Sequence, residues 1–332
     1  MSEPNGALLS VENLVVQFHT IDGTVLALND VDFNVRKGEV LGLVGETGCG
    51  KTATSLAVLR LLPDNAEVVK GQIVFEGHDI LSENIDQVAK IRGRRLSMIF
   101  QDPASSLNPV FKVGAQIMDV LKAYYPNDDE GKLAGLAKEK LSMAELPDSE
   151  SVMGLYPHEL SGGMQQRVIM AVALCSSPSL IIADEPTTAL DVTIQAQLLA
   201  LLRKLKDALG LSVLLITHNL GLVRELCDRV AIMYAGSIVE IAETQRIFQN
   251  PLHPYTRGLL SSVVTGRLRG QILHHIPGFV PSLINPPSGC RFNPRCAYAI
   301  ARCKDERPRL EEVEPRHFVA CYNMPKEPWW RK

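Results

Sequence analysis

Gly45-Glu46-Thr47-Gly48-Cys49-Gly50-Lys51-Thr52 is the stretch that decides the fold. It matches the phosphate-binding loop pattern, in which a glycine, four variable residues and Gly-Lys-Ser/Thr lie between a strand and a helix. The preceding run Glu39-Val40-Leu41-Gly42-Leu43-Val44 predicts a short buried strand, and the residues from about Lys51 to Leu62 have helical spacing. The sequence therefore predicts a strand, a loop and a helix that together bind phosphate.

The residue types in this loop suit a polyphosphate. Glycines let successive backbone N–H groups turn inward without a Cβ clash, and the N-terminal end of the helix carries a positive partial charge. Lys51 adds a full charge, and the Thr52 hydroxyl can bind Mg²⁺. A Gly-rich turn with a chance Gly-Lys-Thr is the alternative, but the flanking strand and helix favour phosphate binding. Taken alone, the loop predicts only a nucleotide ligand.

Length, charge and hydropathy exclude several classes of protein. The 332 residues can bury a large core and predict two or three structural units. A net charge of −3 gives no reason to expect a nucleic-acid partner, and we interpret Arg92-Gly93-Arg94-Arg95 as solvated loop charges. The most apolar region, Val168 to Ala183, is interrupted by Pro178 and falls short of the roughly 20 residues that cross a bilayer. The N-terminus has no signal-type pattern, so we expect the chain to stay in the cytosol.

The first residues predict an antiparallel edge sheet. Val11–Phe18 and Val31–Val35 have strand patterns, and Asp22-Gly23 marks a turn after the first of them. Phe18 can stack its ring on a purine, and an ordinary core phenylalanine is the alternative. The remaining strands are predicted at Gly71–Gly77, Leu96–Phe100, Leu180–Ala183, Val213–Ile216, Val230–Met233 and Ser237–Ile241, the last two as a hairpin.

A helical insertion is predicted from about residue 104 to residue 170, where helical spacing replaces the strand patterns. It ends in Leu160-Ser161-Gly162-Gly163-Met164-Gln165-Gln166-Arg167. Ser161 can cap a helix that begins with glycines, which leaves backbone N–H groups open to another phosphate. An ordinary capped helix is the alternative. A later helix from about Val192 should stop at Gly210.

Polar side chains follow two of the predicted buried strands. Asp184 and Glu185 come after one strand, and His218 comes after another. Ligands bind at the carboxyl ends of strands in open α/β sheets. We expect Asp184 to hold Mg²⁺, Glu185 to polarise an attacking water and His218 to contact the terminal phosphate. A structural role is the alternative for His218.

In this order, the motifs resemble those of the ATP-binding subunits of ABC transporters, over roughly residues 8–250. Gly45–Thr52 is similar to the Walker A loop of that family, Leu160–Arg167 to its signature and Leu180–Glu185 to its Walker B strand. The Q-loop, D-loop and switch histidine are matched by Gln101, Asp191 and His218. The resemblance implies an α/β fold, a P-loop NTPase core of RecA type with an antiparallel β edge subdomain and a helical insertion.

The resemblance also implies a role for each matching residue. Catalysis would fall to Glu185, His218 and Lys51, and Mg²⁺ would be held by Thr52, Gln101 and Asp184. Contacts to ATP are implied for Phe18, Gly45, Glu46, Thr47, Gly48, Cys49, Gly50, Lys51, Thr52, Thr54 and Gln101. Two ATPase subunits of this family pack head to tail, so the ATP of one would be completed by the partner's signature residues Ser161, Gly162, Gly163 and Gln165.

The same resemblance implies the other components of a transporter. The second ATPase subunit would be a copy of this chain or a paralogue. Two transmembrane permease subunits and an extracytoplasmic substrate-binding protein would complete the complex. The chain would then be a peripheral protein on the cytoplasmic face of the cell (inner) membrane.

Prolines interrupt the chain after Asn250, which predicts an ATPase domain over residues 1–250 and an extension over residues 251–332. The extension contains four cysteines, separated by 5, 6 and 17 residues: Cys290, Cys296, Cys303 and Cys321. In a reducing compartment such crowding predicts a metal site, with Zn²⁺ and an iron–sulfur cluster both open and unligated thiols as the alternative. Asn250–Thr256 and Pro287–Cys296 resemble the extension of the dipeptide/oligopeptide importer branch. Because some members of that branch carry a [4Fe–4S] cluster, the resemblance favours a cluster over Zn²⁺. The proline-rich extension has few apolar residues with which to hold itself together, so we expect the metal site to act as a structural staple.

The resemblance implies an enzyme that hydrolyses ATP to drive the import of dipeptides or oligopeptides. Nickel or oligosaccharide import by the same motor is the alternative. A soluble ABC ATPase acting on DNA or ribosomes should have tandem ATPase units or a long coiled coil, and the sequence has neither. A metal-sensing regulator would place its function in the extension.

Overall fold

The computed structural model describes residues 6–102, 106–187, 190–262 and 275–325. The chain forms two compact units. The first unit comprises Met1–Val35, Val40–Ser82 and Ile216–Lys332, and the second comprises Arg36–Glu39 and Glu83–Leu215. The expected start of the helical insertion at residue 104, together with Thr188 and Ala189 before the D-loop aspartate, lies outside the described residues.

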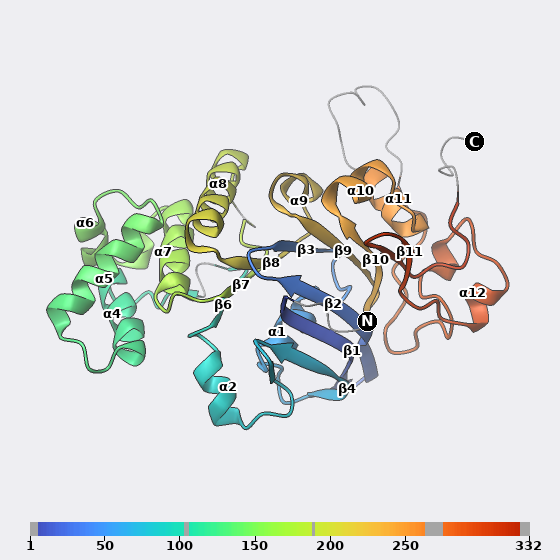
Figure 1. Cartoon of the computed structure of the whole chain (residues 1–332), viewed down its shortest axis with the longest axis horizontal. Coiled ribbons are helices and arrows are strands. Elements are labelled where there is room, and N and C mark those ends of the chain that lie inside the picture. The colour runs from blue at the N-terminus through green and yellow to red at the C-terminus, as the bar shows by residue number, and fades with distance from the viewer. Residues whose placement is uncertain (1–5, 103–105, 188–189, 263–274, 326–332) are drawn as a thin grey trace. The chain divides into compact units, whose positions relative to one another are not determined.

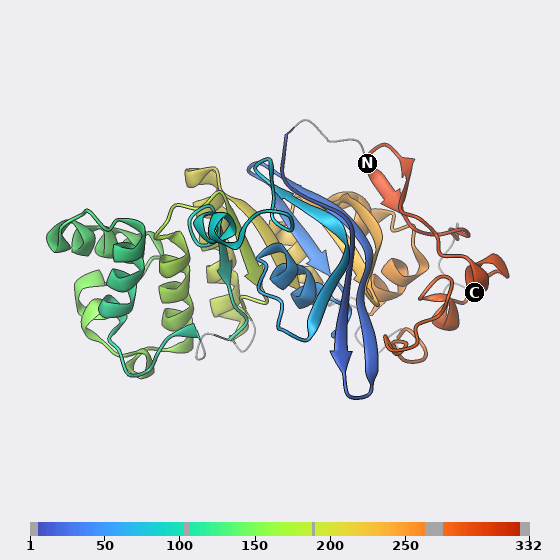
Figure 2. The ribbon, with the colours of Figure 1, turned by 90° about the horizontal axis from the view of Figure 1, so that it is seen from below.

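An antiparallel sheet in the first unit confirms the predicted edge sheet. Its strands, in the order β2-β1-β4-β5, are β1 (Ala7–Thr20), β2 (Gly23–Arg36), β4 (Ala66–Phe75) and β5 (His78–Asp79). The first two form a long hairpin, drawn in blue in Figure 2. β1 and β2 extend well beyond Val11–Phe18 and Val31–Val35, because strand pairing continues past the apolar positions that carry the sequence signal.

The first unit also contains the strand that leads into the phosphate-binding loop. Five strands lie in the order β11-β12-β10-β9-β3, with bounds β3 (Val40–Val44), β9 (Arg229–Tyr234), β10 (Ser237–Glu243), β11 (Glu311–Glu314) and β12 (His317–Val319). β3 and β9 are parallel, whereas β9, β10, β12 and β11 pair antiparallel. All residues of β3 and β9 are buried. The hairpin of β9 and β10 confirms the prediction, and its turn residues Ala235 and Gly236 both have positive φ, as a two-residue turn requires.

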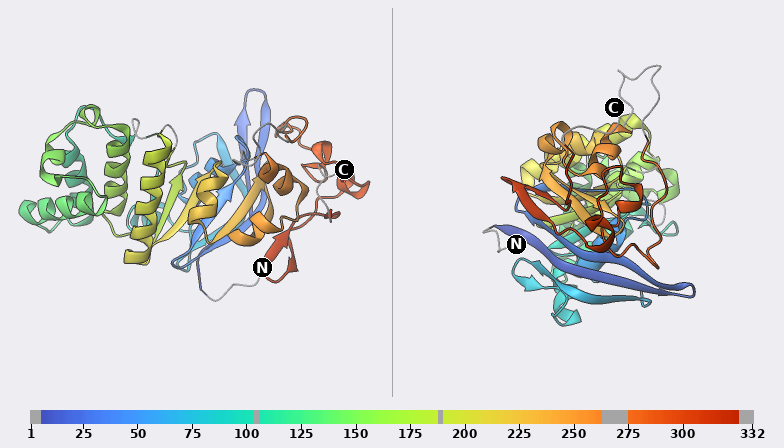
Figure 3. Two further views of the ribbon diagram at one scale, coloured as in Figure 1. Left: turned by 90° about the horizontal axis from the view of Figure 1, so that it is seen from above. Right: turned by 90° about the vertical axis from the view of Figure 1, so that its right-hand side faces the viewer.

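Strands of the C-terminal extension therefore continue a sheet of the ATPase core. β11 and β12, red in Figure 3, pair with each other, and β12 pairs with β10 through Glu240 opposite Val319. The extension is part of the first compact unit rather than a separate body.

The helix after the loop, α1 (Lys51–Val58), is four residues shorter than the predicted Lys51–Leu62. Arg60 adopts left-handed φ of 51°, and the Leu61 N–H donates to the Leu56 carbonyl over 2.8 Å. The Arg60 N–H donates to Ala57 over 3.0 Å. These two bonds form a Schellman motif, which ends the helix without a glycine. The other helices of this unit are α9 (Leu220–Leu226), α10 (Thr244–Gln249), α11 (Pro254–Ser261), the 3₁₀ turn η3 (Asn293–Arg295) and α12 (Arg302–Asp305).

The second unit contains the strands β8-β7-β6 in that order (Figure 1), with bounds β6 (Leu96–Ile99), β7 (Leu180–Asp184) and β8 (Ser212–Thr217). β6 and β7 are parallel. The second unit also contains the helices α2 (Ile85–Ile91) and α8 (Val192–Leu209). Gly210, with φ of 63°, ends α8 where the sequence predicts.

Helices fill the stretch in which an insertion is expected. They are α4 (Val113–Tyr124), α5 (Glu130–Met143), α6 (Ser149–Gly154), the 3₁₀ turn η1 (Pro157–Glu159) and α7 (Gly162–Leu174), green in Figure 1. α4 packs against α5, α6 and α7, and its buried face includes Val113, Ile117 and Leu121. Among the described residues, no helix is both long enough and apolar enough to cross a membrane.

Candidate functional site

The phosphate-binding loop of the first unit requires its glycines. Gly48 and Gly50 have φ of 78° and 108°, which side chains other than glycine rarely adopt. A Cβ at Gly45 would lie 2.2 Å from the Met233 carbonyl oxygen, so no larger residue fits there. The loop therefore lies against the end of β9, and α1 begins directly after it.

Lys51 lies buried inside the loop. Its Nζ donates to the carbonyl oxygens of Gly45 at 2.8 Å and Glu46 at 3.1 Å. Cys49 is also buried, and burial raises the pKa of its thiol, so it remains neutral. The loop thus holds its ammonium group in position with its own carbonyl groups, and Cys49 adds no negative charge where phosphate would bind.

The other predicted residues of the first unit differ in exposure. Thr47 and Thr52 are exposed, whereas Thr54 is fully buried and its hydroxyl donates to the Gly50 carbonyl over 2.9 Å. Thr54 therefore supports the loop from within α1. Phe18 is half-buried near the end of β1, opposite Ala66.

The second unit brings together two predicted residues that are distant in the sequence. Asp184, the buried last residue of β7, is followed by Glu185, whose φ of 47° is unusual for a residue with a side chain. Nε2 of Gln101 donates to Oε2 of Glu185 over 3.2 Å. Carboxylate and amide oxygens are hard ligands, so Asp184 and Gln101 fit the chemistry of Mg²⁺.

The predicted signature forms the N-terminus of α7. The Ser161 hydroxyl accepts a hydrogen bond from the Met164 N–H over 3.4 Å, which confirms the predicted cap. Ser161 and Gly162 are exposed. A Cβ at Gly163 would lie 2.9 Å from Cγ2 of Ile194, so glycine permits the close approach of α7 to α8. The Gln165 amide donates to the Pro157 carbonyl over 2.8 Å and holds the preceding turn.

Two further predicted residues lie at helix starts. Asp191 caps α8 by accepting from the Ile194 N–H over 2.9 Å. His218 is exposed directly after β8, and its neighbour Asn219 caps α9 by accepting from the Gly221 N–H over 3.0 Å.

Comparison with known proteins identifies the family. Residues 28–188 match the family described as ABC transporter, and residues 239–303 match the oligopeptide/dipeptide transporter C-terminal region. The chain is 47% identical over 317 residues to the probable peptide ABC transporter ATP-binding protein y4tR of Sinorhizobium fredii, covering 95% of this chain and 94% of that protein. This chain belongs to the ATP-binding proteins of ABC transporters. It is an ABC ATPase of the oligopeptide/dipeptide branch.

Two further comparisons support the same family for this ABC ATPase. The oligopeptide transport ATP-binding protein OppD of Escherichia coli is 43% identical over 321 residues, with 97% of this chain and 94% of that protein covered. The dimeric structure of the ATP-binding cassette MJ0796 bound to ADP and Pi matches with a TM-score of 0.64 at 26% identity. That match covers 71% of this chain and 98% of the cassette, which confirms the ABC ATPase fold.

The metal site predicted at the four cysteines of the extension is not shown by the structure. All four are free thiols, and within the described parts of the chain no three His, Cys, Asp or Glu side chains are arranged to hold a metal ion. Burial, with the neighbouring cysteines as a smaller cause, raises the pKa of Cys296 to about 11 and that of Cys321 to about 12. The thiols are thus near enough to influence one another.

Buried polar contacts hold the extension to the ABC ATPase core. Nε2 of His317 on β12 lies 2.7 Å from Oε1 of Glu240 on β10, and both side chains are fully buried. Glu240 also accepts from the Leu252 N–H at 2.7 Å and the His253 N–H at 3.0 Å. One carboxylate on β10 therefore fixes two separate segments of the chain that follow it.

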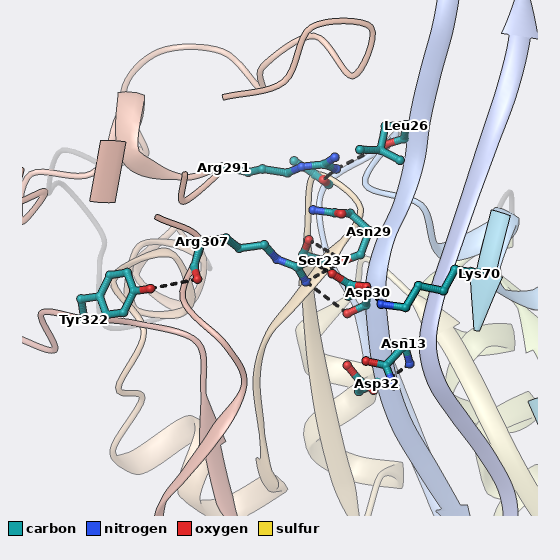
Figure 4. Close-up of polar contacts among 11 residues, drawn as sticks. Asn13, Leu26, Asn29, Asp30, Asp32, Lys70, Ser237, Arg291, Arg307 and Tyr322 are labelled. Atoms are coloured by element: carbon teal, nitrogen blue, oxygen red, sulfur yellow. Dashed lines mark hydrogen bonds and ion pairs between the residues drawn. The ribbon is translucent and has the colours of Figure 1, made fainter. Parts of the chain in front are cut away.

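A second attachment involves the edge sheet, as Figure 4 shows. Arg307 pairs with Asp30 on β2 and donates to the Asn29 carbonyl over 2.7 Å. Lys70 contacts the same Asp30 at 3.2 Å. Burial alone would raise the pKa of Asp30, but the hydrogen bond from Lys70 and the charge of Arg307 lower it. Arg291 donates to the carbonyl oxygens of Leu26, at 3.3 Å, and Ala235.

The sequence motifs missed three side chains at the phosphate-binding loop. The Tyr255 hydroxyl accepts from the Glu46 N–H over 3.1 Å, and Arg295 forms an ion pair with the Glu46 carboxylate at 3.1 Å. Tyr234 lies beside both, with its ring centroid 4.6 Å from that of Tyr255. Arg295 is 249 residues from Glu46, and no local pattern marks the pair.

Proposed function

We propose that this ABC ATPase hydrolyses ATP to drive the import of dipeptides or oligopeptides through separate membrane subunits. This proposal rests on two family matches in one chain. Residues 28–188 match the ABC transporter family, and residues 239–303 match the oligopeptide/dipeptide transporter C-terminal region. Relatives that align along nearly the whole chain are named as oligopeptide transport proteins, which supports the same cargo class.

ATP would bind at the phosphate-binding loop of the first unit. Lys51 now donates to the carbonyl oxygens of Gly45 and Glu46, and these bonds would give way to bonds with phosphate oxygens. The N-terminus of α1 adds backbone N–H donors. Phe18 would stack on the base, and His218 would contact the terminal phosphate.

Mg²⁺ would be held by the Thr52 hydroxyl, the Asp184 carboxylate and the Gln101 amide oxygen, which are the ligand types it prefers. When bound, it would offset the negative charge of the phosphate groups. Glu185 would act as the general base that takes a proton from the attacking water. Its hydrogen bond with Gln101 supports this role, because it fixes the direction of the carboxylate.

The exposed start of α7 supports a role in binding the nucleotide of a second subunit. Ser161 and Gly162 are exposed and begin a 13-residue helix, whose N-terminal N–H groups favour an anion. We propose a head-to-tail pair with a copy or a paralogue, attached to two permease subunits on the cytoplasmic face of the membrane. A substrate-binding protein outside the membrane would deliver the peptide.

For the four cysteines, a metal-bound state remains a separate proposal. Four sulfur donors suit a [4Fe–4S] cluster or Zn²⁺, and the electrostatic influence of Cys290, Cys296 and Cys303 on Cys321 supports their proximity. Metal binding would have to bring the sulfur atoms closer together. Iron or zinc analysis of anaerobically purified protein, compared with Cys296→Ser, tests this, and metal-free wild-type protein would reject it.

The transport function is tested in cells that lack the gene for this chain. Uptake of a radiolabelled tripeptide should be lost, restored by the wild-type chain and not restored by Glu185→Gln. Nickel and a labelled oligosaccharide are the comparison cargoes. Unchanged tripeptide uptake in the deletion strain, together with loss of nickel or oligosaccharide uptake, would refute peptide import while leaving the ATPase intact.

A further inference from the structure

Arg295 lies in the extension, yet its side chain is directed to the phosphate-binding loop. Its NH1 group contacts the two carboxylate oxygens of Glu46 at 3.3 and 3.1 Å, and the Tyr234 hydroxyl at 3.3 Å. Its Nε and NH2 groups donate to the carbonyl oxygens of Pro277 at 3.0 Å and Ile276 at 3.3 Å. Only 6% of the Arg295 side chain is exposed. The guanidinium is thus held on several sides and has little freedom to leave Glu46.

Glu46 is the second residue of the loop and is fixed at three groups. Its carboxylate meets Arg295, its N–H donates to the Tyr255 hydroxyl over 3.1 Å, and its carbonyl accepts from Lys51. Two of these three partners lie in the chain that follows the ATPase core. Since backbone N–H groups of this loop are the expected phosphate ligands, the position of Glu46 affects the whole loop.

Aromatic rings link this contact to the cysteine segment. Phe292 lies 5.1 Å from the ring of Tyr234 and 5.5 Å from that of Tyr255, measured between ring centroids. Phe292 and Arg295 both lie between Cys290 and Cys296 in the chain. The segment from Cys290 to Cys296 therefore packs beside the phosphate-binding loop, through the rings of Tyr234 and Tyr255 and through Arg295.

We propose that Arg295 is a positioning residue for the phosphate-binding loop, so that the C-terminal extension completes the ATP site of its own chain. The inference rests on the proposed function, in which residues 45–52 bind ATP. Arg295 offsets the charge of the Glu46 carboxylate, which would otherwise repel the triphosphate, and it fixes the turn that begins the loop. Glu46 is 28% exposed, so solvent screens this carboxylate only in part.

A double-mutant cycle on the full-length chain tests the proposal. ATP with Mg²⁺ is titrated by calorimetry in a Glu185→Gln background, which prevents turnover. Arg295→Gln should weaken ATP binding about 5- to 10-fold, because the Glu46 carboxylate is left without its cation, whereas Arg295→Lys should recover part of the loss. Adding Glu46→Gln to Arg295→Gln should return the affinity for ATP to within about threefold of the parent, which is the Glu185→Gln protein, since the repelling carboxylate charge is removed.

A control and a second ligand separate positioning from folding. Arg302→Gln removes an arginine of the same extension that pairs with Glu306 at the surface, and it should leave ATP affinity unchanged. AMP lacks the outer phosphates, so its weaker binding should change less than that of ATP in Arg295→Gln. Equal ATP affinity of Arg295→Gln and parent, or strictly additive effects of the two substitutions, would overturn the inference. Failure of the parent itself to bind ATP would instead refute the proposed function.

Discussion

Nε2 of Gln101 donates a 3.2 Å hydrogen bond to Oε2 of Glu185, although 84 residues separate the two along the chain. Gln101 follows β6 and Glu185 follows β7, and these strands are parallel neighbours. Their carboxyl ends therefore meet at one edge, which is where open α/β sheets bind ligands. The positive φ of Glu185 costs on the order of 1 to 3 kcal/mol, a cost typical of functional positions.

Replacing Glu185 by Gln should stop turnover and leave ATP binding intact. The amide has the shape of the carboxylate but cannot take a proton from water, so kcat should fall by about 10² to 10⁴. A steady-state phosphate-release assay and an ATP titration measure the two effects, and size-exclusion chromatography with ATP should show an accumulated dimer. Glu150→Gln, at an exposed carboxylate of α6 paired with Lys138, is the matched control. Normal turnover by Glu185→Gln would show that the base is misassigned.

Replacing Lys51 by Ala should weaken nucleotide binding strongly, by about 100-fold or more, because a buried ammonium group that can meet the phosphates is removed. The loss should also loosen the loop, since Lys51 holds the carbonyl oxygens of Gly45 and Glu46. Calorimetric titration with ATP checks the affinity. Lys122→Ala changes an exposed lysine paired with Glu130 and should bind ATP normally. An unchanged ATP affinity in Lys51→Ala would argue against the phosphate-binding loop.

Stability should fall as the solution becomes mildly acidic because of His253. Burial lowers the pKa of His253 to about 4, and the charge of Glu240 offsets this only in part. Its Nδ1 accepts from the Tyr255 N–H over 3.0 Å and caps α11, which requires the neutral ring. Between about pH 6.5 and pH 4 the unfolded chain binds this proton and the folded chain does not. Stability is therefore lost as pH falls through that window, by on the order of 2 kcal/mol at pH 5.

The measurement for His253 compares urea unfolding at pH 7.5 and pH 5 in the wild type and in His253→Asn. Asparagine keeps an oxygen that can cap the helix but does not titrate. The variant should lose less stability between the two pH values than the wild type. Equal losses in both proteins would mean that another group is responsible.

Sequence patterns predicted the parts of the fold and site that depend on neighbours along the chain. Gly210 ends α8 as predicted, and Ser161 caps α7, because both signals are local. The predicted end of α1 was wrong because Arg60 closes a Schellman motif that is normally marked by glycine. The contact of Arg295 with Glu46 depends on the path of the whole extension, which no periodicity encodes.

The four cysteines also show that a sequence pattern identifies candidate residues but not their arrangement in space. Composition identifies four possible sulfur donors, but only the backbone determines whether their sulfur atoms meet. The Cys290 N–H donates to the Cys303 carbonyl over 2.8 Å, which brings two backbone segments together without bringing the thiols into a ligand arrangement. The cysteines predict a metal site from the sequence, whereas in this structure their backbone segments meet without a ligand arrangement among the described residues.

Replacing Glu240 by Ala should detach the extension from the core. His317 and the N–H groups of Leu252 and His253 would lose a buried acceptor together, which should cost about 3 to 5 kcal/mol. Thermal unfolding and limited proteolysis measure the effect, with faster cleavage expected after residue 250. Glu243→Ala, at an exposed carboxylate of the same strand that pairs with Arg316, is the matched control and should change stability by less than about 1 kcal/mol. If both variants were equally stable, the buried carboxylate would not be what holds β12 and α11 to β10.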